Sequence, residues 1–68
     1  MKKETIKINA EKICLRLESD LTDTNINKIK KDCKLSLIEL HTALGWLAKE
    51  DKIFFFNENK FTYVFPVE

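Results

Sequence analysis

The chain has 68 residues, 44% of them apolar and 34% charged, a composition typical of a folded domain and not of a disordered segment. This length predicts one domain over residues 1–68, with a free energy of unfolding on the order of 3–10 kcal/mol. No apolar run approaches the roughly 20 residues of a membrane span, and alternating Ile and Lys after the N-terminus do not form a signal peptide. We therefore expect a cytoplasmic protein with no membrane partner.

The residues that could carry chemistry are few. Cys14 and Cys33 fall at apolar helical positions, where cysteine usually acts as a small core residue. Together with His41 they offer three ligands and no C-x-x-C pair, so we expect neither a metal nor a cofactor. No nucleophile can be matched with a base, and the sole glycine, Gly45, lies in a predicted helix and not in a phosphate-binding loop. We expect no enzyme activity and no small-molecule substrate.

The first predicted helix begins after Asn9, a favourable N-cap, and ends near Ser19. Its predicted buried stripe is Ala10, Ile13, Cys14, Leu17 and Leu21, and its predicted water-facing residues are Glu11, Lys12, Arg16 and Glu18. Asp, Ser and Thr residues from Ser19 to Thr24 indicate a loop, in which Leu21–Thr22 would be a very short strand.

A second helix is predicted from a Thr24–Asn25 cap to Cys33, with Ile26, Ile29 and Cys33 inward. Its opposite face carries Lys28, Lys31 and Lys34, flanked by Lys30. A turn at Lys34–Ser36 follows, and the Leu35 side chain is expected to pack into the core between the second and third helices.

The third helix has the clearest pattern. Ser36 and Glu39 form the S-x-x-E capping box, and the predicted apolar stripe is Leu37, Leu40, Leu44 and Leu47. The helix is expected to end at Glu50–Asp51.

Two β-prone runs follow, Lys52–Asn57 and Lys60–Val67, joined by a polar turn. A tip at Glu58–Asn59 would pair Phe56 with Phe61 and Phe54 with Tyr63. Ile53, Phe55, Thr62 and Val64 would share the other face, and the pattern leaves open which face is inside. Pro66 is expected to stop the last strand. The whole predicts an α+β winged helix-turn-helix: helix, short strand, two helices and a two-stranded wing.

The stretch ALGWLAKEDKI, residues 43–53, with Asn9–Ala10 and the wing, resembles a family of small, uncharacterised bacterial and archaeal winged helix-turn-helix proteins. Their signature is approximately A-L-G-W-L-A-R-E-x-K-I, and Lys49 stands here in the place of the Arg. The resemblance implies the fold and a homodimer, and brings no catalytic residue or defined ligand.

Winged helices most often bind DNA and regulate transcription, so double-stranded DNA is the first partner to test. Residues 1–35 carry nine basic and six acidic groups and residues 36–68 carry three and five, so positive charge gathers in the first half. The predicted outer face of the third helix (Ile38, Glu39, Thr42, Gly45, Trp46, Lys49) offers little for reading bases. The candidate DNA contacts are Lys28, Lys31, Lys34, Ser36, Thr42 and Lys49.

The alternative function is a protein-interaction or dimerisation module that does not bind DNA. Its candidate interface residues are Trp46, Phe54, Phe56, Phe61 and Tyr63. If the wing aromatics lie outward and half exposed, they leave roughly 300–500 Å² of apolar surface. This is near the upper limit for a monomer. Trp46 could instead pack against its own wing.

Overall fold

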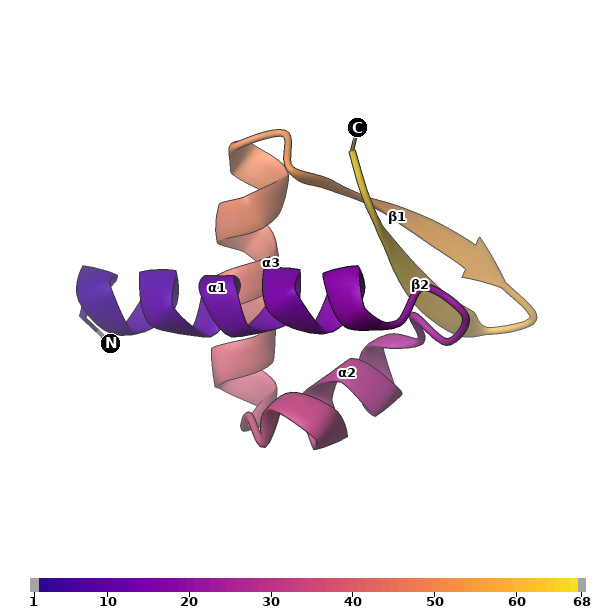
Figure 1. Cartoon of the computed structure of the whole chain (residues 1–68), viewed down its shortest axis with the longest axis horizontal. Coiled ribbons are helices and arrows are strands. Elements are labelled where there is room, and N and C mark those ends of the chain that lie inside the picture. The colour runs from indigo at the N-terminus through magenta and orange to yellow at the C-terminus, as the bar shows by residue number, and fades with distance from the viewer. Residues whose placement is uncertain (1, 68) are drawn as a thin grey trace.

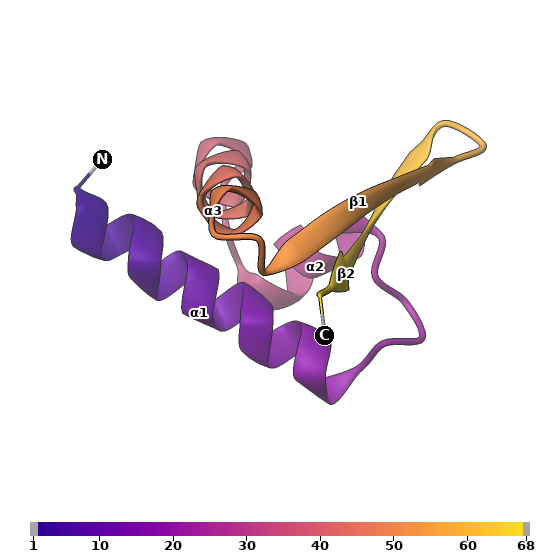
Figure 2. The same ribbon diagram turned by 90° about the horizontal axis from the view of Figure 1, so that it is seen from above.

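The computed structural model describes residues 2–67 as three helices followed by one β-hairpin (Figure 1). The helices are α1 (Lys3–Ser19), α2 (Ile26–Cys33) and α3 (Leu37–Lys49), and the antiparallel strands are β1 (Ile53–Glu58) and β2 (Phe61–Pro66). α1 lies across α3, and the hairpin projects away from the N-terminal half of α1 (Figures 1 and 2). The predicted α+β architecture is confirmed.

The predicted start of the first helix was wrong. α1 begins at Lys3, and Asn9, expected as its cap, lies inside the helix and is buried. Residues 3–8 contain neither Pro nor Gly, so nothing in them stops a helix from extending toward the N-terminus. Ala10, Ile13 and Leu17 are buried as predicted.

The predicted short strand at Leu21–Thr22 was also wrong. The Asp20 carboxylate accepts hydrogen bonds from the Thr22 backbone and hydroxyl, which bends the chain there and leaves Leu21 52% exposed. Strand-like pairing occurs further along, where Asn25 forms a single bridge with Tyr63 and Val64 N–H donates to Thr24 O at 3.0 Å.

Both later helix starts are confirmed. Asn25 caps α2 by accepting from the Asn27 N–H at 2.8 Å. At α3, Ser36 Oγ accepts from the Glu39 N–H at 3.2 Å, and the Glu39 carboxylate accepts from the Ser36 N–H at 2.9 Å. Lys34 ends α2 in the left-handed conformation, with φ of 56°, and so lets the chain turn without a glycine.

The core lies where α1, α2, α3 and the base of the hairpin meet. Leu35, Leu40, Leu44 and Leu47 are buried as expected, but Leu37 is exposed. At 100° per residue, the buried arc of α3 centres between Leu40 and Leu47, about 70° away from Leu37. The largest fully buried side chains are Ile13, Leu17, Ile29, Leu40 and Val64.

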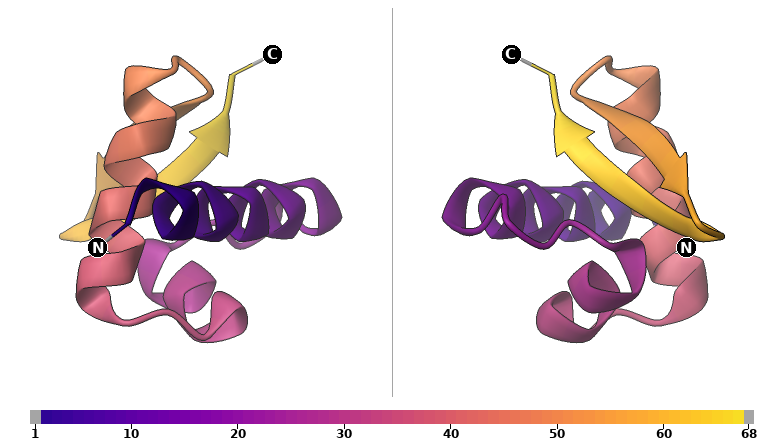
Figure 3. Two further views of the ribbon diagram at one scale, coloured as in Figure 1. Left: turned by 90° about the vertical axis from the view of Figure 1, so that its left-hand side faces the viewer. Right: turned by 90° about the vertical axis from the view of Figure 1, so that its right-hand side faces the viewer.

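The hairpin turns at Asn59 and Lys60, whose φ angles of 50° and 70° are both positive. Its register pairs Phe56 with Tyr63 and Phe54 with Phe65, so the predicted pairs Phe56–Phe61 and Phe54–Tyr63 were displaced by two residues. A shift of two keeps every side chain on its face, so the predicted division into two faces still holds. Figure 3 shows the twisted hairpin from the two opposite sides of the molecule.

Candidate functional site

The buried residues of the wing show which of its faces packs against the helices. Ile53 and Val64 are buried, so their face packs inward, and the face of Phe54, Phe56 and Phe61 points outward. These three side chains are 51%, 48% and 50% exposed. Phe65 stacks on Phe54 with ring centroids 5.6 Å apart. The outward face of the wing is therefore an aromatic surface, which we call the wing face: Phe54, Phe56, Phe61, Tyr63 and Phe65.

Both sides of β1 carry exposed aromatic surface. Phe55, on the other face from Phe54 and Phe56, is also 45% exposed, because the hairpin extends beyond the helices (Figure 2). Three consecutive phenylalanines thus remain about half exposed on one strand. A shallow hollow on the wing face is lined by Leu21, Thr22, Thr24, Phe56, Glu58, Tyr63 and Phe65.

The outer face of α3, which would enter the major groove in the usual docking, is apolar at its start. Leu37 and Ile38 are 58% and 71% exposed. The hydroxyls of Ser36 and Thr42, both predicted DNA contacts, take part in the helix itself: Ser36 caps α3, and the Thr42 hydroxyl donates to the carbonyls of Ile38 and Glu39. α3 therefore presents few groups suited to reading bases.

The predicted lysine contacts on α2 differ in their surroundings. Lys28 Nζ lies 3.5 Å from Asp32 Oδ1, one turn further along the helix, so its charge is partly neutralised. Lys31 and Lys34 are exposed. Lys31 and Lys34 are therefore the two of these three lysines that are best placed to contact phosphate groups.

Trp46 lies against α1, so of the two alternatives for this residue the structure does not realise packing against its own wing. Its half-buried ring contacts the core, and the ammonium groups of Lys3, Lys7 and Lys49 lie 5.7, 5.9 and 6.0 Å from the ring centroid. Cation–π attraction of this kind stabilises three like charges close together. A shallow groove continues from Trp46 between α1 and the end of α3, past Lys7, Cys14 and Lys52.

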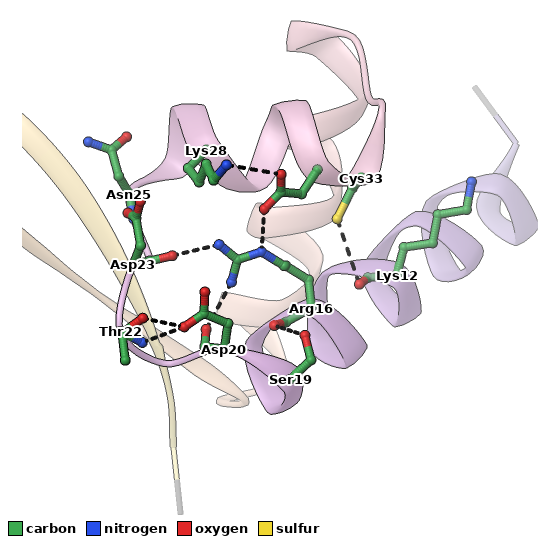
Figure 4. A network of polar contacts seen from close by, with 10 residues as sticks. Lys12, Arg16, Ser19, Asp20, Thr22, Asp23, Asn25, Lys28 and Cys33 are labelled. Atoms are coloured by element: carbon green, nitrogen blue, oxygen red, sulfur yellow. Dashed lines mark hydrogen bonds and ion pairs between the residues drawn. The ribbon is translucent and has the colours of Figure 1, made fainter.

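The sequence did not predict the polar network around Arg16. Arg16, predicted to face water, has a side chain only 9% exposed and donates three hydrogen bonds (Figure 4). It reaches the Asp32 carboxylate at 2.7 Å and the carbonyls of Asp20 and Asp23 at 2.8 and 2.6 Å. The hydrogen bond from Arg16 lowers the pKa of Asp32, and the nearby charge of Lys28 adds to this. The sequence pattern carried no signal for this role, because two of the three acceptors are backbone carbonyls and the third, Asp32, lies 16 residues away.

The two cysteines within residues 2–67 are both half-buried free thiols. Burial raises the pKa of each thiol, and Cys33 Sγ lies 3.7 Å from the Lys12 carbonyl. Over the described chain no cluster of three or more His, Cys, Asp or Glu residues is placed to hold a metal. No helix among these residues is long and apolar enough to cross a membrane.

Comparison with known proteins supports the fold directly. A solution NMR structure of protein BT2368 from Bacteroides thetaiotaomicron is similar, with a TM-score of 0.81 and 27% sequence identity, over 97% of this chain and 79% of that one. The comparison with curated proteins found no match. The family described as winged helix-turn-helix domain (DUF2582) matches residues 1–66. This chain therefore belongs to that family of winged helix-turn-helix domains.

Proposed function

We propose that this domain is a protein-interaction module that self-associates as a homodimer through the wing. The observation that carries the proposal is the outward position of Phe54, Phe56 and Phe61, each about half exposed on one continuous face. The polar tip and Lys52 border this aromatic centre. An aromatic patch with a polar rim is the usual composition of a protein interface.

The size of the patch supports this choice. Aromatic side chains bury about 150–250 Å² each, so the three half-exposed rings of Phe54, Phe56 and Phe61 leave roughly 200–400 Å² of apolar area. Monomers rarely expose larger apolar patches, and patches near this limit often bind another protein. Contact between two wings would bury the sides of these rings and so add to the small free energy of unfolding that is expected of so short a chain.

DNA binding is the second candidate. The fold and two observations favour it. Lys3, Lys7 and Lys49 gather around Trp46. Lys31 on α2 and Lys34 directly after it are exposed. Such lysines suit phosphate contacts, which give affinity without sequence preference. Four contacts would give a slope of roughly −3.6 in a plot of log affinity against log salt concentration.

The test combines solution mass and DNA affinity for one set of variants. The double variant Phe54→Ser/Phe56→Ser is expected to lose self-association. The control Ile38→Ser, which removes a still more exposed apolar side chain from α3, is expected to keep it. Lys31→Glu/Lys34→Glu, which reverses the two lysine charges best placed for phosphate, is also expected to leave the assembly intact. Circular dichroism confirms that each variant is folded. A monomeric wild type that binds random duplex DNA with a steep salt dependence, and loses it with the lysine pair, would overturn the proposal in favour of DNA binding.

A further inference from the structure

β1 is the outer strand of the sheet. One edge of β2 pairs with β1, and its other edge receives Thr24 and Asn25. Within residues 2–67, no backbone hydrogen bond from outside the hairpin reaches Ile53–Glu58. Sheet edges of this kind are normally blocked by charge, proline or a bulge, yet residues 53–57 here are Ile, three Phe and Asn.

The backbone groups that face this edge can be identified. Val67 N–H donates to Lys52 O at 2.9 Å, so Lys52 directs its backbone groups toward the neighbouring strand. Alternation along an antiparallel ladder then directs Phe54, Phe56 and Glu58 toward β2 as well. The N–H and C=O groups of Ile53, Phe55 and Asn57 therefore face outward, along the edge.

We infer that this edge pairs with the same edge of a second copy of the chain, antiparallel, about a twofold axis through Phe55. The inference rests on the proposed self-association and specifies its geometry. Phe55 exchanges both backbone hydrogen bonds with Phe55 of the second copy, and the two hairpins become one continuous four-stranded sheet. On the wing face, Phe54 of each copy lies opposite Phe56 of the other, a pairing of aromatic side chains that stabilises neighbouring strands. The contact is self-complementary and closed, as a twofold dimer requires.

The charges at the two ends of β1 favour this register. With the axis at Phe55, Lys52 of one copy lies opposite Glu58 of the other, and this occurs twice. Moving the axis to Phe56 would bring Lys52 opposite Lys60, and moving it to Phe54 would bring Glu58 toward Glu50. A shift by a single residue in the pairing would place opposing side chains on different faces of the sheet. Among twofold pairings centred on the three phenylalanines, only the one at Phe55 sets opposite charges against each other.

The first test uses amide hydrogen exchange of the full chain, followed by NMR at rising protein concentration. The Phe55 amide, which faces the edge, is expected to become protected as the concentration rises. The Phe56 amide bonds within the hairpin and serves as the matched control, with protection that does not depend on concentration. A Phe55 amide that exchanges equally fast at all concentrations, in a protein that does dimerise, would overturn the inference while leaving the proposed function standing.

The second test reverses the end charges and follows the dissociation constant by sedimentation. Lys52→Glu and Glu58→Lys are each expected to weaken the dimer roughly tenfold, because each replaces two attractive pairs by two repulsive ones. The double variant Lys52→Glu/Glu58→Lys restores the pairs and should return the constant to near the wild-type value. Single variants without effect, or a double variant as weak as the singles, would contradict the register. A wild type that stays monomeric at every concentration would overturn both the inference and the proposed function.

Discussion

Replacing Arg16 by Met should be the most destabilising single change at a polar position of this domain. The guanidinium ties α1 to α2 through Asp32 and to the intervening loop through the carbonyls of Asp20 and Asp23, with all three contacts at 2.6–2.8 Å. Hydrogen bonds from a charged donor contribute about 1.5–3 kcal/mol each when well shielded. Water can reach these partners once Arg16 is gone, so we take about 1 kcal/mol for each bond. The expected loss is therefore about 2–4 kcal/mol, a large part of the roughly 3–10 kcal/mol expected in total.

Urea unfolding measures this loss. The fluorescence of Trp46, the sole tryptophan, reports on the contact between α1 and α3, and far-UV circular dichroism reports on the helices. Arg16→Lys is the matched control, because it keeps the charge and the apolar stem but cannot donate in three directions. It should recover only part of the loss. A cost below about 1 kcal/mol for Arg16→Met would mean that the three bonds contribute little in solution and would contradict this prediction.

Three further predictions concern other parts of the chain. Gly45→Ala should stabilise the protein by about 0.5–1 kcal/mol, because Gly45 is helical and exposed and an added Cβ meets no atom within 4 Å; unchanged or lower stability in urea would contradict this. Hydrogen bonds from Ser36 lower the pKa of Glu39, so its contribution is complete above the ordinary Glu pKa and is lost as the pH falls through the lower folded value. Stability should therefore fall more steeply below about pH 5 in the wild type than in Glu39→Gln, and parallel acid-unfolding curves would disprove it. Burial raises the pKa of both Cys14 and Cys33, so each should react with a thiol reagent at pH 8 more slowly in the folded protein than in urea, a prediction that equal rates would exclude.

Local signals in the sequence were reliable where one residue type decides the structure. The capping box of Ser36 and Glu39 and the cap at Asn25 were confirmed because a side chain there satisfies backbone groups a few residues away. The turn at Lys34 was found despite having no glycine, from the polar break between two apolar patterns.

Features that depend on contacts between distant segments could not be found in this way. Asn9 is a favourable cap by residue type, yet packing of the whole of α1 carries the helix past it. The hairpin register depends on two consecutive positive φ angles, and Lys60, unlike Asn or Gly, gives no sign that it adopts one. Arg16 and Trp46 acquire their partners only when α1 meets the loop and α3, so their positions required the folded structure.

The sequence predicted which wing residues share a face, but not which way that face points. Phe54, Phe56 and Phe61 do lie on one face, because a strand alternates its side chains whatever its register. The face points outward because Ile53 and Val64, on the opposite face, are buried. The sequence does not reveal this, because aromatic residues occupy both faces of the strand.

We propose above all that the wing joins two copies of this chain. Sedimentation of the wild type over a wide range of concentrations, beside Phe54→Ser/Phe56→Ser, tests it most directly. We expect the wild type to pass from monomer to dimer as concentration rises, while the double variant stays folded and monomeric throughout. A wild type that remains monomeric, or a double variant that dimerises as well as the wild type, would contradict it.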